Sequence, residues 1–255
     1  MSHALGIPLH KVNVHVRHVG AGFGGKAGIN FEPLVVLLSK FSGGRPVKLL
    51  LTPEEEFITA AQRQRFYGWI KRGVDADGKI TAEHIKYIYD ARAYADYGVK
   101  PNRAAGYSCT GPYEVPNIHP DSITVYTNHP YGTAFRGFEH LEFLWAVERQ
   151  MDMVALKIRL DPVEFRLRNV LRPGSITATG EKLREDAGRV DQCIKAVAET
   201  IGWGKKEKRT ASGKLVGTGI AALWKAPAMP PNAASAAIIK SNEDGSATLS
   251  VGGRK

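Results

Sequence analysis

One short run of glycines is the stretch of this sequence best suited to hold a ligand. Residues 20–26 read Gly-Ala-Gly-Phe-Gly-Gly-Lys, so five of seven positions are small and one bulky aromatic residue, Phe23, stands between glycines. Glycine permits positive φ and has no Cβ, which lets backbone N–H groups approach a bulky, usually anionic, ligand. We therefore expect a ligand-binding loop here.

The segment before this loop has the pattern of a half-buried strand. Val12, Val14 and Val16 fall on one face of residues 11–19, and basic or polar side chains fall on the other. Strict alternation of this kind is typical of a strand with one face in the core. We predict that the glycine loop follows the end of this strand.

A dinucleotide-binding motif fits the same glycines in part. Gly20, Gly22 and Gly25 satisfy G-x-G-x-x-G, the pattern of NAD(P)-dependent dehydrogenases. The helical pattern begins only near Phe31, too late for the glycines to open the helix, and no carboxylate follows the strand predicted over residues 46–51 to hold a ribose. The dehydrogenase stays an alternative.

A mononucleotide P-loop fits less well, and a simple turn is the other alternative. Gly20, Gly25 and Lys26 satisfy G-x-x-x-x-G-K, but Ala27 stands where the P-loop needs a hydroxyl for magnesium. Glycine runs also serve as connections that bind nothing.

Further motifs make a third interpretation more specific. The segment Thr-Ala-Phe-Arg-Gly-Phe lies downstream at residues 133–138. Together with Gly-Phe-Gly-Gly-Lys at residues 22–26, it resembles the cofactor loops of the molybdenum hydroxylases, the xanthine dehydrogenase and aldehyde oxidase family. Residues 111–117 (GPYEVPN) and 161–169 (DPVEFRLRN) also resemble landmarks of that family. Four ordered markers cover most of the chain.

The resemblance implies an oxidoreductase that hydroxylates an aldehyde or an N-heterocycle with a molybdenum-pyranopterin (molybdopterin) cofactor and a glutamate base. The implied partners are iron-sulfur and FAD subunits or domains of the same complex. No residue of this chain is implied as a direct metal ligand. The implied cofactor contacts are Gly22, Phe23, Gly24, Gly25, Arg136 and Gly137, and the implied substrate contacts are Phe138 and Ala27. Without the resemblance, Arg136 would be interpreted as a surface ion-pair partner and the phenylalanines as core.

The chain departs from the family pattern near the implied substrate. Xanthine-oxidising members carry a glutamate after the loop lysine, where this chain has Ala27, and a substrate-facing arginine where it has Ala104 beside Arg103. These departures argue against purine oxidation. The family's Phe-Gly-x-Pro-Gln continuation reads Phe-Glu-His-Leu-Glu at residues 138–142, so we expect an altered cofactor contact after Phe138.

The family's glutamate base would lie beyond Lys255, so we assign no catalytic residue. The carboxylates of residues 54–56, Glu139 and Glu142 fall at predicted helix starts, where solvent or capping accounts for them. We therefore expect a fragment of the molybdopterin-binding large subunit that is inactive alone and holds no stoichiometric cofactor. A non-catalytic cofactor-binding or assembly module is the alternative.

Composition and charge narrow the classes of partner. The net charge is +10 and the pI about 9.6, but the basic residues are dispersed and no nucleic-acid-binding motif accompanies them, so we expect no nucleic acid. The longest apolar run, residues 34–38, is too short to span a membrane, and the N-terminus lacks signal-peptide features. We expect a cytoplasmic protein. Cys109 and Cys193 lie too far apart in sequence to suggest a disulfide framework or a zinc site.

The predicted fold class is α+β, a mixed sheet with packed helices that resembles the family's cofactor-binding domain. A hairpin is expected over residues 66–89, turning at Gly78, and residues 90–117 look irregular. A short buried helix is predicted over 33–40, with a buried strand as the alternative, and another helix begins at a capping box of Thr52 and Glu55. Further helices cover 139–158, 161–171 with Asp161 as its cap, and 191–201. The helix over 139–158 carries an apolar stripe that includes Leu141, Leu144, Trp145 and Met151. Further strands cover 122–127, 215–223, 234–241 and 247–251.

Both glycine loops follow predicted strands, so we expect them to converge at one end of the sheet. We divide the chain into a first cofactor-binding domain (1–172) that lacks its N-terminal part, a linker (173–188) and the beginning of a second domain (189–255).

Overall fold

The computed structural model describes the 255-residue chain except residues 18, 96, 205–211, 226–235 and 252–255. The chain divides into two compact units, Met1–Trp224 and Lys225–Lys255. Both glycine loops belong to the first unit. The boundary placed from the sequence at residues 173–188 stays a prediction.

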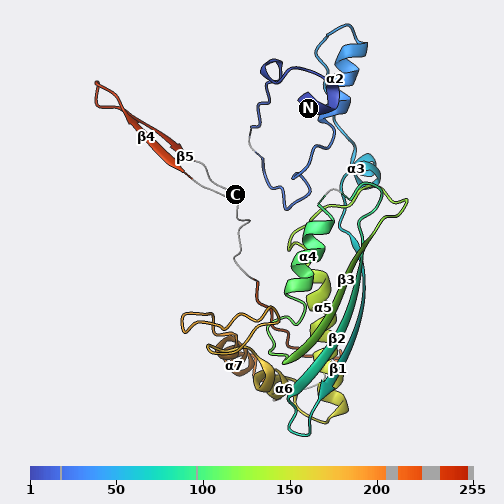
Figure 1. The fold of residues 1–255 in the computed structure, drawn as a ribbon, viewed down its shortest axis with the longest axis vertical. Coiled ribbons are helices and arrows are strands. Elements are labelled where there is room, and N and C mark those ends of the chain that lie inside the picture. The colour runs from blue at the N-terminus through green and yellow to red at the C-terminus, as the bar shows by residue number, and fades with distance from the viewer. Residues whose placement is uncertain (18, 96, 205–211, 226–235, 252–255) are drawn as a thin grey trace. The chain divides into compact units, whose positions relative to one another are not determined.

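A three-stranded mixed sheet forms the centre of the first unit (Figure 1). β1 (Arg65–Val74) pairs antiparallel with β2 (Ile80–Asp90), and β3 (Asn117–Val125) runs parallel to β2. The β1–β2 turn has Gly78 at φ 75°, and the Asp75 carboxylate accepts the N–H groups of Asp77 and Lys79 at 3.0 and 2.8 Å. The predicted hairpin and mixed sheet are confirmed.

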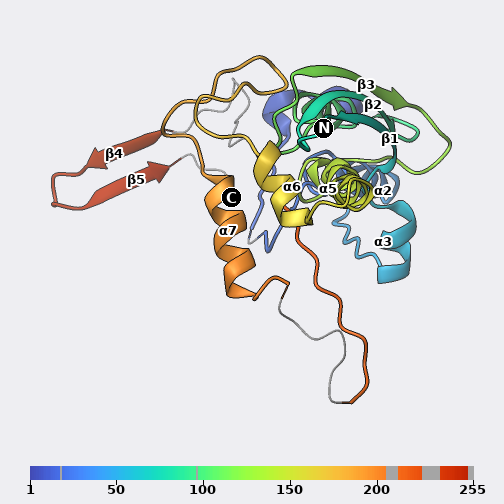
Figure 2. The ribbon, with the colours of Figure 1, turned by 90° about the horizontal axis from the view of Figure 1, so that it is seen from below.

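Two helices cover one face of this sheet (Figure 1). They are α4 (Val99–Tyr107), beside β3, and α5 (His140–Lys157), which packs against β1 (Figures 1 and 2). The buried side chains of α5 recur at helical spacing and include Phe143, Leu144, Val147, Met151 and Ala155. The helix agrees with its prediction, but the predicted apolar stripe was wrong at Leu141 and Trp145, which are exposed.

α6 (Pro162–Asn169) and α7 (Val190–Thr200) continue the helical layer. Asp161 caps α6 by accepting the N–H groups of Val163 and Glu164 at 2.8 and 3.1 Å, as the sequence predicts. The wholly buried Arg166 of α6 donates to Glu148 of α5 at 2.9 Å. This buried ion pair joins the two helices in the core.

The N-terminal sixty residues differ most from the sequence prediction. They form α1 (Ser2–Leu5), the 3₁₀ turn η1 (Leu9–Lys11), α2 (Glu32–Phe41) and α3 (Pro53–Thr59). The strands predicted over 11–19 and 46–51 are wrong: the described residues there form no ladder, and an extended segment without a partner strand is not stable as a strand. α2 agrees with the predicted helix, but the predicted burial of this helix is wrong: no residue of α2 is buried. The predicted capping box at Thr52 and Glu55 is confirmed.

Three other predictions need correction. α4 lies inside the segment predicted to be irregular, and β3 begins five residues before its predicted start. The strand predicted over 215–223 is wrong: apart from one isolated bridge at Leu215, the described backbone there pairs with no other strand. The second unit contains the hairpin of β4 (Ala237–Ser241) and β5 (Ala247–Val251), close to prediction; residues 234 and 235 lie outside the described residues.

Across the described part of the chain, every helix is too short or too polar to serve as a membrane span.

Candidate functional site

The two glycine loops meet in space although they are far apart in the sequence. The Arg136 N–H donates to the carbonyl of Phe23 at 2.6 Å. The Arg136 guanidinium also lies over the Phe23 ring, 5.3 Å from its centroid, as a cation–π pair. Residues 22–25 and 135–138 therefore form one surface, and the predicted convergence of the two loops is confirmed.

The first loop depends on glycine at one position in particular. Phe23 has φ 50° and Gly24 has φ 98°, and the Gly25 N–H closes a turn onto the Gly22 carbonyl at 2.9 Å. A Cβ at Gly24 would overlap the carbonyl oxygen of Ala134 and lie 2.8 Å from its carbonyl carbon. At Gly22 and Gly25 the nearest atoms would be 3.8 and 3.6 Å away. Gly24 is thus required for the contact between the loops.

The second loop holds a strained backbone. Arg136, Gly137, Phe138 and Glu139 have φ values of 32°, 122°, 54° and 63° in succession. Left-handed conformations at non-glycine residues cost of order 1–3 kcal/mol each and persist only where the surroundings impose them. Such strain is commonly found at ligand sites. The loop therefore needs contacts that hold it in place.

Arg63 provides those contacts. Its guanidinium donates to the Arg136 carbonyl at 3.4 Å, lies 5.1 Å from the centroid of the Phe135 ring, and forms an ion pair with Glu142. Arg92 in turn donates to the Arg63 carbonyl at 2.9 Å. The sequence analysis missed Arg63, because nothing in its local pattern distinguishes it from other arginines that precede a strand.

Glu139, directly after the second loop, is a buried carboxylate with a raised pKa. It is fully buried, and burial together with neighbouring Glu142 raises its pKa to about 8 against the opposing effect of Arg63. Among the described residues, no N–H or O–H group donates a hydrogen bond to either of its carboxylate oxygens. The prediction that solvent or capping accounts for Glu139 and Glu142 is wrong, because Glu139 makes no side-chain cap and Glu142 pairs with Arg63.

The paired loops carry backbone hydrogen-bond donors without protein partners and one exposed cation. Among the described residues, the N–H groups of Phe23, Gly24, Gly137 and Phe138 donate to no other protein group. The Arg136 side chain is exposed and Phe138 is half-buried. Backbone N–H groups grouped in tight turns form concavities that bind anionic or acceptor-rich ligands. This donor set is the strongest chemical feature of the two loops.

A hollow of about 860 Å³ lies beside the first loop. It is lined mostly by apolar side chains of residues 1–60, together with Gly25 and Lys26. Its lining, as far as the structure describes the chain, includes none of residues 135–138. The hollow is thus adjacent to the joined loops rather than enclosed between them.

Comparisons with known proteins agree on one family. The model of the molybdopterin cofactor-binding domain matches residues 1–170. The chain is 33% identical over 204 residues to the nicotinate dehydrogenase large molybdopterin subunit of Eubacterium barkeri. It matches the crystal structure of the aldehyde oxidoreductase from Desulfovibrio desulfuricans ATCC 27774 with a TM-score of 0.76 and 29% identity, and that of quinoline 2-oxidoreductase from Pseudomonas putida 86 with a TM-score of 0.70 and 31% identity.

These matches cover most of this chain and a smaller part of each relative. The match covers 79% of this chain and 48% of the nicotinate dehydrogenase subunit. For the aldehyde oxidoreductase the shares are 90% and 25%, and for quinoline 2-oxidoreductase 79% and 26%. The chain thus spans about half the length of the first relative and about a quarter of each structure.

Proposed function

Because the chain belongs to the molybdopterin cofactor-binding domain family, we propose that its two joined loops bind the pyranopterin of a molybdenum hydroxylase. In this proposal, Gly22, Phe23, Gly24 and Gly25 form one side of the binding surface, and Arg136 and Gly137 form the other. The observation that carries it is the contact between the loops, the 2.6 Å hydrogen bond from Arg136 to Phe23. A ligand that spans both loops then meets one continuous set of donors.

The residues present fit such a group. A pyranopterin phosphate is anionic and rich in acceptors, and the loops offer backbone N–H groups without protein partners and the exposed cation of Arg136. Gly22 and Gly25 leave open space in front of the backbone, with no other heavy atom within 3.5 Å of an added Cβ. When bound, the cofactor supplies the redox chemistry, and the chain supplies binding and orientation.

The Phe23 ring would limit how the cofactor lies. The Phe23 side chain is 54% exposed, and the Arg136 guanidinium covers one of its faces. The carbonyl group of Phe23 is already used by Arg136, so its N–H and ring remain for the ligand. Phe23 therefore serves as a wall that helps to exclude water, rather than as an acid or base.

The proposed substrate is an aldehyde or an N-heterocycle, and we propose Phe138 and Ala27 as the residues that contact it. Phe138 is half-buried, and an aromatic face of this kind can stack on a planar ring. Ala27 is exposed and its methyl group neither donates nor accepts a hydrogen bond, which disfavours a purine with several polar edges. The names of two relatives, nicotinate dehydrogenase and quinoline 2-oxidoreductase, support a heterocycle.

In the proposed complex, iron-sulfur and FAD subunits or domains accept the electrons of turnover. Glu139 is not assigned as the glutamate base that the family resemblance implies, because its carboxylate is fully buried. Within this proposal, residues 1–172 form the first cofactor-binding domain and residues 189–255 the beginning of the second, and the complex is cytoplasmic.

The proposal is tested by mapping where the cofactor binds. Molybdopterin, released anaerobically from a purified molybdenum hydroxylase, is titrated into the isotope-labelled chain while backbone amide shifts are followed. We expect shifts at Phe23, Gly24, Gly137 and Phe138. NAD⁺ under the same conditions is the matched control ligand. Shifts with NAD⁺ alone would favour the dehydrogenase alternative, and molybdopterin shifts confined to other residues would reject the proposed site.

A further inference from the structure

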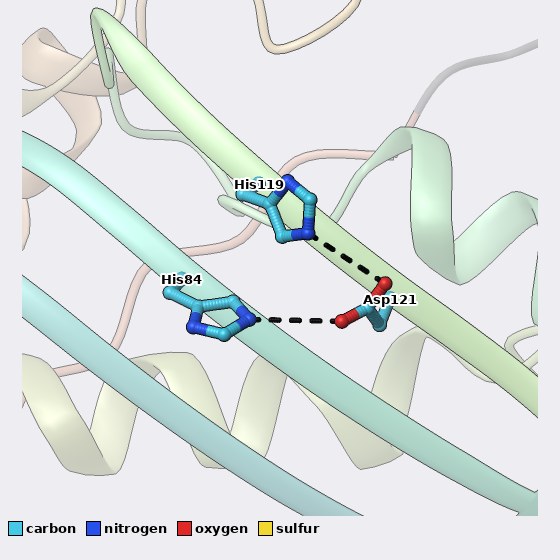
Figure 3. Close-up of side chains that lie close together, drawn as sticks. All are labelled: His84, His119 and Asp121. Atoms are coloured by element: carbon cyan, nitrogen blue, oxygen red, sulfur yellow. Dashed lines mark ion pairs between the residues drawn. The ribbon is translucent and has the colours of Figure 1, made fainter.

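Two histidines and an aspartate meet on the face of the sheet opposite α4 and α5. His84 lies on β2, and His119 and Asp121 lie on β3. The parallel register pairs His84 with His119, and Asp121 follows two positions later, so all three side chains leave the same face (Figure 3). The opposite face carries the buried Ile85 and Tyr87 of the core.

The ligand atoms of these side chains are close enough to share one ion. The Nε2 atoms of His84 and His119 lie 3.6 and 3.8 Å from different oxygens of Asp121, and the candidate ligand atoms all fall within 4.8 Å of one another. A metal ion about 2.1 Å from each ligand would set them roughly 3.0–3.5 Å apart. Shifts below about 1 Å in each side chain would close the site, and all three are about half exposed or more and free to move.

We propose that His84, His119 and Asp121 form a binding site for one divalent transition-metal ion of the zinc, nickel or copper type. Two imidazoles and one carboxylate are ligands these ions favour, whereas magnesium and calcium favour oxygen ligands alone. The remaining coordination positions face solvent. The bound ion would join β2 to β3 through their side chains and would stabilise the parallel pair.

Neighbouring lysines set the electrostatic cost of binding. Lys71 of β1 lies opposite His84, and Lys86 of β2 lies opposite Asp121, each on the face that carries the proposed ligands. Both ammonium groups disfavour a nearby dication. We therefore expect the site to bind a metal ion more weakly than the same three ligands would without the lysines, and removal of the Lys71 charge should tighten metal binding.

The experiment is calorimetric titration of zinc chloride into the full chain, prepared without a histidine tag and stripped with a chelator. We expect one ion per chain for the wild type, and at least about tenfold weaker binding for His84→Ala and Asp121→Asn. His10→Ala, at another exposed histidine, is the matched control and should bind as the wild type does. Lys71→Gln should bind more tightly than the wild type.

A second measurement guards against misfolded variants. The replaced side chains are exposed, so circular dichroism and metal-free melting temperature should match the wild type. Zinc should raise the melting temperature of the wild type and His10→Ala, but not that of His84→Ala. Absence of wild-type zinc binding, or equal binding by folded His84→Ala and Asp121→Asn, would overturn the proposal.

Discussion

Replacing Gly24 by alanine should separate the two glycine loops without unfolding the core. The new Cβ would overlap the Ala134 carbonyl oxygen, whereas Cβ atoms essentially never come within 3.0 Å of other heavy atoms, so one loop must move by about an ångström or more. The backbone φ of 98° adds strain of about 1–3 kcal/mol for a residue with a side chain. The hydrogen bond from Arg136 to Phe23, worth about 0.5–1.5 kcal/mol, opposes separation in the wild type and the variant alike, so it does not enter the difference between them.

Relief of this strain favours the separated state by about 1–3 kcal/mol, and relief of the overlap adds to it. Since each 1.4 kcal/mol is a factor of ten in an equilibrium, hydrogen exchange of the Arg136 amide should accelerate about five- to a hundredfold or more, up to complete loss of its protection. Exchange is measured residue by residue in the chain without ligand. Amides of β2, in the core, should exchange as in the wild type.

Gly22→Ala is the matched control within the same loop. Its Cβ would have 3.8 Å to the nearest side-chain atom, and its φ lies outside the left-handed region. Arg136 should keep its protection in this variant. Unchanged protection in Gly24→Ala, or equal loss in both variants, would refute the reasoning.

Three further predictions concern stability and activity. The pKa of Glu139 is raised to about 8 from an ordinary value of 4.5, so between those pH values the folded chain keeps a proton that the unfolded chain loses. The free energy of unfolding should therefore fall as pH rises, by up to about 1.4 kcal/mol per pH unit. Urea unfolding from pH 5.5 to 7.5 should show a weaker dependence of this free energy on pH for Glu139→Gln than for the wild type. Glu148→Ala removes a buried carboxylate that accepts from Arg166, Tyr113 and the Ala222 N–H, and it leaves Arg166 with the partly exposed Asp152 as its carboxylate partner. It should cost about 3–5 kcal/mol in urea unfolding, against less than about 1 kcal/mol for Glu164→Ala at an exposed pair. The purified chain should carry no stoichiometric molybdenum by elemental analysis and should not oxidise aldehydes with an artificial electron acceptor; turnover abolished by Phe23→Ala would contradict this.

Local patterns predicted those elements that their own residues determine. The β1–β2 hairpin needs only alternation on both sides of a turn that admits Gly78, and α6 needs only the cap at Asp161. The α5 helix was also predictable from its period. The Leu141 and Trp145 errors arose because the sequence gives the spacing of an apolar stripe but not the angle at which the helix meets the sheet.

Features that depend on distant partners were not predictable. The valines of residues 12–16 alternate like a strand, but whether they form one depends on a neighbour that the described residues do not supply. The convergence of the two loops was predicted from their positions after strands and from their resemblance to one family, but the close approach of Gly24 to Ala134 was not. Arg63 and the burial of Glu139 had no local signal, because both follow from where β1 and α5 meet the second loop.

The central claim is that the joined loops, rather than either loop alone, hold the pyranopterin. The direct test is equilibrium dialysis of molybdopterin, detected by pterin fluorescence, against the wild type, Gly24→Ala and the control Gly20→Ala, whose Cβ would meet no atom within 4 Å. We predict weak but measurable binding by the wild type and Gly20→Ala, and at least about tenfold weaker binding by Gly24→Ala. Equal affinity of Gly24→Ala and the wild type, or no binding by the wild type, would contradict the claim.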